Sequence, residues 1–248
     1  MPRASAEPAY RRIAAEWAEA IDNGKFQDGF QLPTRQQLQQ QEGVSLQVVR
    51  DAFTLLHHEG YLRSEPAKGT FVYRLPRLTL PMYTLEEDDR SVDAFVAIVE
   101  EQGRKGRQEI EVSVVRPHPT ITAALRLVED GLALVRRRTR YVDDIPYAIA
   151  DSYYPHEVVV GSAVADPADI TTGLRHVLAD LGYPMVRHHD TVVARRPHRR
   201  EIEALSLAPG LPVIAHNRTS FTADGTAIRV LAWILPSDRW ELTYEVRP

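Results

Sequence analysis

The stretch GKFQDGFQLPTRQQLQQQEGVSLQVVRDAFTLLHHEGYLRSEPAKGTFVY, residues 24–73, decides the fold of the first part of the chain. Thr34 and Ser45 are residue types that cap the beginnings of helices, and Gly43 favours the left-handed backbone of a tight turn. The spacing predicts two short helices joined by that turn. Two short apolar segments then flank a turn at Lys68-Gly69, which is the pattern of a β-hairpin. Helix, turn, helix and hairpin in this order predict a winged helix-turn-helix, which presents one helix end to the major groove of DNA.

An amphipathic helix is predicted before this stretch, ending near Asn23-Gly24. Its apolar side chains recur at three- and four-residue steps: Tyr10, Ile13, Trp17, Ala20 and Ile21. In the helix that Ser45 begins, the apolar residues between Val48 and Leu56 supply the buried side. The exposed N-terminal end is therefore expected to carry the residues positioned for DNA, namely Ser45, Leu46, Gln47 and Arg50.

A set of spaced motif residues runs through the stretch: Leu32-Pro33-Thr34, Gly43-Val44-Ser45, Val49-Arg50, Ala52, Leu56, Glu59-Gly60-Tyr61-Leu62 and Lys68-Gly69-Thr70-Phe71-Val72. This set resembles the GntR family of bacterial transcription regulators. The resemblance implies that the cap residue, the two residues after it and the arginine of the same helix contact the operator. With the neighbouring helix and the hairpin turn, the predicted DNA-binding residues are Arg35, Gln36, Ser45, Leu46, Gln47, Arg50, Lys68 and Gly69.

Two positions depart from the family pattern, because many members carry arginine where this chain has Gln36 and Leu46. Arg35 is expected to replace the first of these charges. Taken alone, Arg50 is equally well explained as a solvated helix charge and Lys68 as an ordinary turn residue. Residues 1–76 contain nine Lys or Arg and nine Asp or Glu, so this part is formally neutral and does not support DNA binding by its net charge. We therefore expect modest affinity per monomer, a homodimer and a palindromic operator.

Composition limits the class of protein. The chain has 248 residues, 44% of them hydrophobic, and no cysteine, so we expect two domains and neither disulfides nor cysteine metal sites. No apolar run approaches the length of a membrane helix, and the N-terminus lacks the apolar middle of a signal peptide. A cytoplasmic protein without cofactor is the expectation.

The predicted domains are a winged helix-turn-helix over residues 1–75, a linker with two prolines over 76–82, and a second domain over 83–248. An acidic run, Glu86-Glu87-Asp88-Asp89, precedes a helix expected to begin at Ser91; the run is interpreted as helix-terminal charge rather than an interaction tail. Further along, strands are predicted at 107–116, 132–142, 146–154, 185–196, 211–222 and 226–235, with helices at 120–128, 171–181 and 198–207. The fold class is therefore α+β, with an antiparallel sheet and helices on one side. A weak internal echo relates 132–155 to 211–236.

The second domain contains its own motif set: Gly131-Leu132-Ala133-Leu134-Val135, residues 138–146, Ser152-Tyr153-Tyr154-Pro155, residues 207–213, Asp224-Gly225 and Asp238-Arg239. This set resembles the UTRA effector-binding domain of the HutC-type subfamily, which has a chorismate-lyase-like fold. The resemblance implies a ligand pocket in the sheet, a homodimer, and repression controlled by a small molecule.

Strand alternation places Arg136, Arg138 and Arg140 on one face of a strand. These guanidinium groups need anions, which either acidic neighbours across the sheet or a carboxylate or phosphate ligand can supply. In the family, the pair equivalent to Arg138 and Arg140 binds the acidic group of the effector, so an anionic effector is favoured. The predicted effector-binding residues are Thr84, Arg138, Arg140, Tyr153 and Arg229.

Other pocket positions depart from the members that bind amino-sugar phosphates. Ala150 and Arg229 stand where those members carry glutamates, and Gly173 stands where they carry a serine. Because partners for sugar hydroxyls are missing, a different ligand that is larger or more apolar is expected. Candidate lining residues are Tyr83, Thr84, Tyr147, Tyr153 and Trp233, each of which is also a common core or rim residue.

Two other classes of protein, an enzyme and a DNA-binding protein without effector, are alternatives. The implied fold also serves a lyase, but His188 and His189 are adjacent in a strand and point to opposite faces, and no phosphate loop or catalytic motif occurs. We therefore expect no enzyme, no catalytic residue and no metal. A DNA-binding protein without effector explains the first domain equally well and leaves the second unexplained. The favoured reading is a repressor whose effector changes the spacing of two DNA-binding domains.

Overall fold

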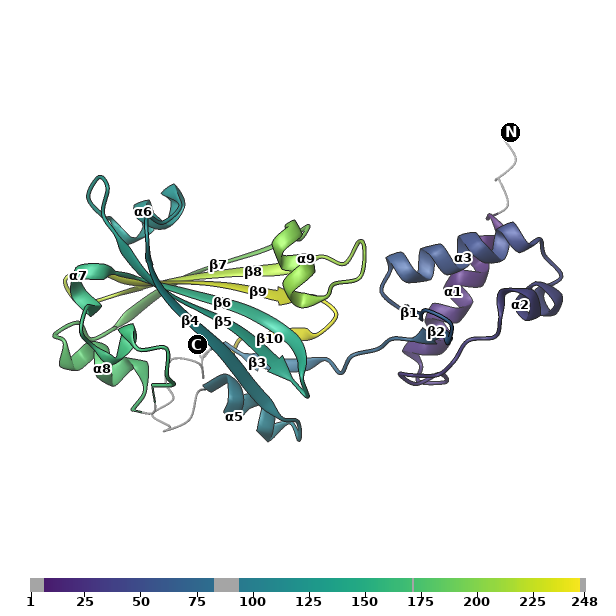
Figure 1. Cartoon of the computed structure of the whole chain (residues 1–248), viewed down its shortest axis with the longest axis horizontal. Coiled ribbons are helices and arrows are strands. Elements are labelled where there is room, and N and C mark those ends of the chain that lie inside the picture. Colours follow the sequence, from purple (N-terminus) through teal and green to yellow (C-terminus); the bar gives the residue numbers. More distant parts are fainter. Residues whose placement is uncertain (1–6, 83–93, 171, 246–248) are drawn as a thin grey trace. The chain divides into compact units, whose positions relative to one another are not determined.

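The computed structural model describes residues 7–82, 94–170 and 172–245. The chain divides into two compact units after Pro76, except that the short segment Leu207–Leu211 groups with the first unit. Figure 1 shows that the first unit consists of helices and one small hairpin, and that the second unit consists of a broad sheet with helices packed on it.

The first unit has the predicted order of three helices and a hairpin. Its elements are α1 (Ala9–Asp22), α2 (Arg35–Glu42), α3 (Leu46–His58), β1 (Leu62–Glu65) and β2 (Gly69–Val72). Gly24 follows α1 with φ +74°, and Gly43 follows α2 with φ +64°, as expected for left-handed stops. The predicted winged helix-turn-helix is therefore confirmed. No helix in the described part of the chain is long and apolar enough to cross a membrane.

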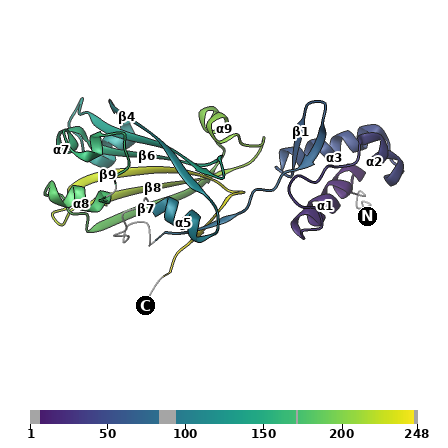
Figure 2. The same ribbon diagram turned by 60° about the horizontal axis from the view of Figure 1, so that its bottom comes forward.

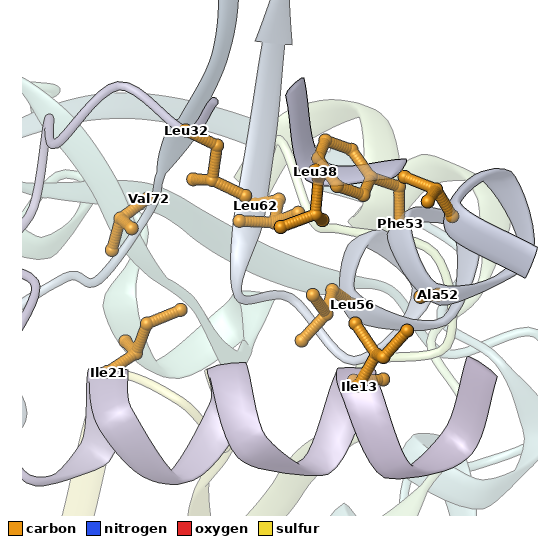
Figure 3. Packing of buried hydrophobic residues seen from close by; sticks show 11 residues of the cluster. Ile13, Ile21, Leu32, Leu38, Ala52, Phe53, Leu56, Leu62 and Val72 are labelled. Carbon is orange, nitrogen blue, oxygen red and sulfur yellow. The ribbon is translucent and has the colours of Figure 1, made fainter. Parts of the chain in front are cut away.

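One hydrophobic core joins all elements of the first unit. Ile13 and Ile21 of α1 point toward residues of α3 and the hairpin in Figure 3, where Leu38 of α2 packs near Phe53. Burial of such side chains contributes about 1.5–3 kcal/mol each. Arg74 closes the far end of α1, because its Nη1 donates hydrogen bonds to the carbonyl oxygens of Ile21 (2.6 Å) and Asp22 (3.0 Å).

The second unit is built on a six-stranded antiparallel sheet. Its strands are β4 (Gly106–Val115), β5 (Ala133–Val142), β6 (Ile145–Pro155), β7 (Arg187–Arg195), β8 (Val213–Phe221) and β9 (Ala227–Pro236). The order across the sheet is β4-β5-β6-β9-β8-β7, so β6 and β9 lie at its centre. All six strands were predicted, and the turn between β5 and β6 has positive φ at Asp143 and Asp144, as a tight hairpin requires. The α+β fold with an antiparallel sheet is confirmed.

Helices lie on both faces of this sheet, so the expectation of helices on one side is wrong. The elements are α5 (Ala94–Glu101), α6 (Pro119–Leu125), α7 (His156–Val159), the 3-10 helix η1 (Ala163–Ala165), α8 (Leu174–Asp180) and α9 (Arg199–Leu205). Leu125 of α6 packs on Ala133 and Val230. Leu178 of α8 packs on Tyr154, whose side chain lies on the opposite face of the sheet from Ala133 and Val230. Figure 1 likewise shows α6 and α9 on the side opposite α8. Short amphipathic helices show that one face is buried, but not which side of a sheet buries it.

The sheet consists of two repeats, β4-α6-β5-β6 and β7-α9-β8-β9. Arg116-Pro117-His118 before α6 recurs 80 positions later as Arg196-Pro197-His198 before α9. Both helices end in a left-handed residue, Arg126 (φ 53°) and Ser206 (φ 49°). Register shifts occur at Arg140/Tyr141 and at Ser220/Phe221, again 80 positions apart. The weak echo in the sequence is therefore a structural duplication about an axis between β6 and β9.

A separate two-stranded parallel sheet joins the beginning of the second unit to its end. β3 (Leu78–Pro81) pairs with β10 (Trp240–Thr243), with Leu78 opposite Trp240. The segment 76–82, predicted as a linker, thus contains a strand. Thr84, the acidic run and the expected cap at Ser91 lie outside the described residues.

Candidate functional sites

Ser45 holds the start of α3 in the form expected of a DNA-reading helix. Its backbone is extended, and its Oγ accepts a hydrogen bond of 3.3 Å from the amide of Val48. Ser45 and Gln47 are exposed, while Leu46 is half-buried. Arg50 is also exposed and has no ion pair within the described part of the chain. The structure therefore brings these four predicted residues to one helix end.

Beside these residues lies a carboxylate, Asp51, which was not foreseen from the sequence. Gln47 Nε2 donates a hydrogen bond of 2.8 Å to Asp51 Oδ1, one helical turn further on. The four-residue spacing in the sequence was a sufficient signal for this pair. Asp51 holds the amide of Gln47 in one orientation and adds a negative charge beside the reading surface.

The start of α2 is fixed by a capping box. Thr34 Oγ1 accepts from the amide of Gln37 (3.3 Å), and Gln37 Oε1 accepts from the amide of Thr34 (2.8 Å). Arg35 is exposed and places its guanidinium 5.8 Å from the centre of the Phe53 ring. Gln36 beside it is exposed as well. Both predicted residues of α2 are thus available to a partner.

The wing, defined as β1, β2 and the turn between them, carries Lys68 at an exposed position. Gln31 Nε2 donates a hydrogen bond of 2.8 Å to the carbonyl oxygen of Lys68. Gly69 has φ +128°, and a Cβ there would lie 2.7 Å from Gln31 Nε2. Gly69 is therefore required by the close approach of Gln31, a role independent of any contact with DNA.

Glu65 reduces the positive charge of the wing. It lies 3.1 Å from Lys68 Nζ and 2.9 Å from Arg63 Nη2. Lys68 first and Arg63 second hold the pKa of Glu65 below its usual value. A groove between the wing and the start of α2 includes Glu65; its lining residues are Gln31, Leu32, Pro33, Thr34, Arg35, Phe53, Ser64, Glu65, Ala67, Lys68, Gly69 and Thr70. Glu65 was not foreseen from the sequence.

His57 connects α3 to the base of the wing. Its Nδ1 lies 2.9 Å from the carbonyl oxygen of Leu62, and its Nε2 lies 3.0 Å from Ser64 Oγ. Burial lowers the pKa of His57, and the positive charge of Arg35 lowers it further. The neutral ring, with its proton assigned to Nδ1, therefore joins the recognition helix to the hairpin.

Five buried arginines share one face of the large sheet, which we call the arginine face. Strand register places Arg136 and Arg138 of β5 opposite Ser152 and Ala150, and opposite residues point to the same side. The register of β9 on β6 and of β8 on β9 places Arg229 and Arg218 on the same face. No side chain in the set is more than 9% exposed: Arg136, Arg138, Arg140, Arg218 and Arg229. Three were expected from β5, and Arg218 was not foreseen.

Arg136 is held by the backbone. Its guanidinium donates to the carbonyl oxygens of Val164 (3.0 Å), Asp166 and Ala168 (2.9 Å), which belong to η1 and the loop after it. Burial lowers the pKa of Arg136, and the charge of Arg138 lowers it further. The side chain therefore anchors this loop to the sheet.

Arg138 and Arg229 converge on one hydroxyl although they come from different strands. Arg138 Nη2 donates to Ser152 Oγ at 2.8 Å, and Arg229 Nη2 lies 3.3 Å from the same oxygen. Ser152 belongs to β6, between them, and the next residue of β6 on this face is Ala150. Two guanidinium groups are thus brought together at this hydroxyl, and planar guanidinium groups match the oxygens of a carboxylate or phosphate.

Arg140 lies between two aromatic rings. Its guanidinium is 4.8 Å from the centre of Phe95 in α5 and 5.1 Å from that of Trp233 in β9. Such cation–π contacts stabilise a desolvated guanidinium. The indole Nε1 of Trp233 is buried and has no hydrogen-bond partner in the described ranges. Trp233, a candidate lining residue, therefore lies on the arginine face.

Arg218 is paired with a carboxylate of the neighbouring edge strand. Its Nε and Nη2 contact the two oxygens of Asp190 at 2.6 Å each, and Nη2 also donates to the carbonyl oxygen of Met82 at 3.2 Å. His216 Nε2 lies 3.4 Å from the same carboxylate. Burial raises the pKa of Asp190, but hydrogen bonds from Arg218 and the contact with His216 outweigh it, so the net shift is downward.

One predicted effector residue, Tyr153, is not brought to this face. Tyr153 pairs with Val135 and Val230, so it points to the opposite side of β6 and packs near Leu125 of α6. Its odd position, next to Ser152, was a signal for this in the sequence. Thr84 lies outside the described residues.

The arginine face contacts the strand that begins the second unit through two aromatic residues. Phe95, which contacts Arg140, lies 6.0 Å from the ring of Trp240 in β10. Trp240 Nε1 donates a hydrogen bond of 2.7 Å to the carbonyl oxygen of Tyr147. Because β10 pairs with β3, a continuous set of contacts leads from Arg140 to β3.

Known families match both units. The profile described as "Bacterial regulatory proteins, gntR family" matches residues 9–72, and the profile of the UTRA domain matches residues 101–241. The second match alone covers more than half of the chain.

Full-length relatives are transcription regulators rather than enzymes. The uncharacterized HTH-type transcriptional regulator SCO4628 of Streptomyces coelicolor is 30% identical over 97% of this chain and 93% of its own length. The HTH-type transcriptional repressor NagR of Bacillus subtilis is 24% identical over 96% of this chain and 94% of its own length. A crystal structure of a GntR-family transcriptional regulator has a TM-score of 0.63 at 21% identity, covering 98% of both chains, which shows the same fold.

Proposed function

The chain belongs to the GntR family of bacterial regulatory proteins and carries a UTRA effector-binding domain, and from this premise we propose how it regulates transcription. We propose a homodimeric repressor that binds a palindromic operator. A small anionic molecule held on the arginine face controls that binding.

We assign base recognition to the N-terminal end of α3. The observation that carries this assignment is that Ser45, Gln47 and Arg50 are exposed together on a capped helix end. Arg50 is the member best suited to a guanine edge, since a guanidinium fork pairs with its two acceptors. Lys68 on the wing would contact phosphate and add affinity without sequence preference.

The homodimer and the palindrome follow from the charge of the first unit. Nine cationic and nine anionic side chains over residues 1–76 leave little net attraction to phosphate. Asp51 and Glu65 lie close to the proposed contact surfaces and weaken that attraction further. Two linked domains on two half-sites turn such weak contacts into specific binding.

The anionic class of the effector follows from the arginine face. Arg138 and Arg229 converge on Ser152 Oγ, and Arg140 is fixed nearby between aromatic rings. Planar guanidinium groups match carboxylate or phosphate oxygens, so several of them gathered on one sheet face suit an anionic ligand. Arg136 is excluded from this role because backbone carbonyls already bind it.

The remainder of the effector is proposed to be apolar or aromatic. The central strand offers the small side chains of Ala148 and Ala150, and Trp233 lies beside them on β9. No hydroxyl-binding glutamate stands at the positions of Ala150 and Arg229, which argues against an amino-sugar phosphate.

The proposed switch acts through β3. An effector that moves Arg140 would displace Phe95 and Trp240, and thereby β10 and the strand paired with it. A ligand that prefers one arrangement of β3 shifts the population of dimers toward one spacing of the DNA-binding domains. Repression is proposed because relatives such as NagR are repressors.

The DNA-binding half can be tested by selection from a pool of random duplexes. The unaltered protein is expected to enrich a palindromic sequence, and Arg50→Ala should abolish gel retardation of that sequence while the dimer persists. Arg199→Ala, which removes an exposed arginine of α9, is the matched control and should bind as before. Retained binding by Arg50→Ala would exclude α3 as the reading helix.

The effector half can be tested with inorganic phosphate as the probe. Phosphate is expected to raise the melting temperature of the protein above that in chloride of equal ionic strength. Arg138→Ala combined with Arg140→Ala should remove this increase and leave operator binding intact, whereas Arg116→Ala, at an exposed ion pair, should change neither. An undiminished phosphate effect in the double variant would place the anion site elsewhere.

A further inference from the structure

The two outermost strands of the large sheet are equivalent in the duplication but differ in their surroundings. β4 forms one margin and β7 the other, as Figure 2 shows. An outermost strand presents a row of backbone N–H and C=O groups that can pair with another chain. Proteins usually protect such a row, so an unprotected one marks a pairing site.

β4 is protected in several ways. Helix α5 packs against it, and Gln108 Nε2 donates a hydrogen bond of 2.7 Å to Asp169 Oδ1 in the loop after η1. Glu109 and Glu111 are exposed along the strand and would repel a second copy of it. Covering elements and repeated charge are the usual defences of an outermost strand.

β7 lacks these defences. Among the described elements, its only substantial packing is with β8. The strand contains neither Lys nor Pro, and its register with β8 is unbroken. Every side chain from Thr191 to Ala194 is exposed, with Val192 46% and Val193 47% exposed on opposite faces. β-branched side chains in this position favour pairing with a further strand.

The sequence of β7 is complementary to itself in the antiparallel direction. With a twofold axis through Val192, that residue faces its own copy, and Thr191 faces Val193 of the other copy. Asp190 then faces Ala194, so no two carboxylates and no two arginines meet within the strand. Pairs of β-branched side chains directly opposite one another stabilise antiparallel sheets.

We propose that β7 pairs with β7 of a second copy of this chain and joins the two six-stranded sheets into one continuous sheet. This inference rests on the proposed homodimer and names its interface. A twofold axis perpendicular to the sheet keeps each face on its own side. The arginine faces of both copies therefore lie on the same side of the joined sheet.

Charge placed at the centre of β7 tests the interface. Val192→Lys combined with Val193→Lys should convert the dimer to a monomer in analytical ultracentrifugation, because paired lysines repel and resist burial. Val114→Lys places the same charge on β4, where Val114 is 47% exposed, and should leave the dimer intact. Circular dichroism verifies that both variants are folded.

Cross-linking of folded protein gives a second readout that does not depend on tolerating lysine. The chain has no cysteine, so a single introduced cysteine reports on its own position. Val192→Cys treated with a short bis-maleimide should give a covalent dimer, and Val114→Cys should not.

The outcomes separate this inference from the proposed function. A protein that is monomeric at all concentrations overturns the homodimer and this interface together. A dimer that survives the lysine pair and shows no cross-link at Val192 overturns the interface alone. Loss of the dimer in Val114→Lys would move the interface to β4.

Discussion

The two units of the chain treat positive charge in opposite ways. In the first unit, the cations assigned to DNA are exposed; Arg50 lacks an ion pair within the described residues and Lys68 has only Glu65 beside it. In the second unit, five arginines are buried on one sheet face. Exposed charge is screened by water and adapts to partners with little effect on stability, whereas buried charge requires defined polar or charged partners. The same residue type is therefore suited to a transient contact in one unit and to a specific site in the other.

The two repeats of the sheet also differ from each other in the groups that surround their buried arginines. Arg138 and Arg218 are equivalent, 80 positions apart, and both are buried. Across the outer strand pair, Arg218 faces Asp190, but Arg138 faces Ile110. The second repeat thus supplies a carboxylate at a position where the first supplies an alkyl group. Because Asp190 already occupies the guanidinium of Arg218, we propose the first repeat rather than the second for the anion of the effector.

The largest expected effect comes from removing the built-in carboxylate. Asp190→Asn should destabilise the second unit by about 3 kcal/mol, because it leaves Arg218 buried without that charge. The free energy of unfolding of this unit can be measured by urea denaturation of a Trp17→Phe variant, with the fluorescence of Trp233 and Trp240 as the signal. Adding Arg218→Met should recover most of the loss. Since the pKa of Asp190 is lowered on folding, the same stabilisation should disappear as the pH falls below about 4. A loss no larger than that of an exposed pair would refute the contrast.

A second change should make the first repeat resemble the second. Ile110→Asp places a carboxylate opposite Arg138, as Asp190 stands opposite Arg218. We expect the increase in melting temperature caused by phosphate to fall by at least half, because the built-in anion competes with it. Ile110→Asn has the same shape without the charge and should retain the increase. Equal responses of the two variants would mean that phosphate does not bind at Arg138.

A smaller effect is expected on the wing of the first unit. Glu65→Gln removes the carboxylate that contacts Lys68 and Arg63, so affinity for the selected operator should rise about two- to fivefold. The gain should diminish at high salt. Glu16→Gln, at an exposed pair on α1, is the control. Unchanged affinity would indicate that the wing does not approach the DNA backbone.

The smallest effect concerns His57. Because burial lowers the pKa of this ring, the unfolded chain takes up a proton more readily than the folded one. Its stabilisation should be complete above about pH 6.5 and decline as the pH falls below that value. The protection factors of amides in peptides from α3 and β1, corrected for the pH dependence of intrinsic exchange, should therefore decrease on acidification. His57→Gln should weaken this pH dependence, and His58→Gln, at the exposed neighbouring position, should not.

Local signals in the sequence were enough for most of the fold. Thr34 and Ser45 cap helices, Gly43 makes the turn, and Asp143-Asp144 makes a hairpin, each through interactions within a few residues. β3 and β10 were missed because four-residue strands that pair in parallel from opposite ends of a domain leave no local pattern. The side of the sheet that each helix covers depends equally on distant residues.

In the candidate sites, local signals likewise predicted which residues lie together but not which partners hold them. Alternation placed Arg138 and Arg140 together, but it gave no indication that loop carbonyls hold Arg136. The pairing of Arg218 with Asp190 required the register of β7 on β8, which no sequence motif reveals. The assignment of the effector, the operator contacts and the dimer stays a prediction until the measurements above are made.

The parallel pairing of β3 with β10 has a consequence for how the protein is made. β3 leaves the ribosome long before its partner strand, because all six strands of the large sheet are translated between them. The first unit can fold as soon as it emerges, since N-terminal domains generally fold during synthesis. The pairing of β3 with β10 can form only after β10 has been translated. A nascent chain stalled before Trp240, or a product that lacks β10, would therefore carry a folded first unit followed by an unpaired β3.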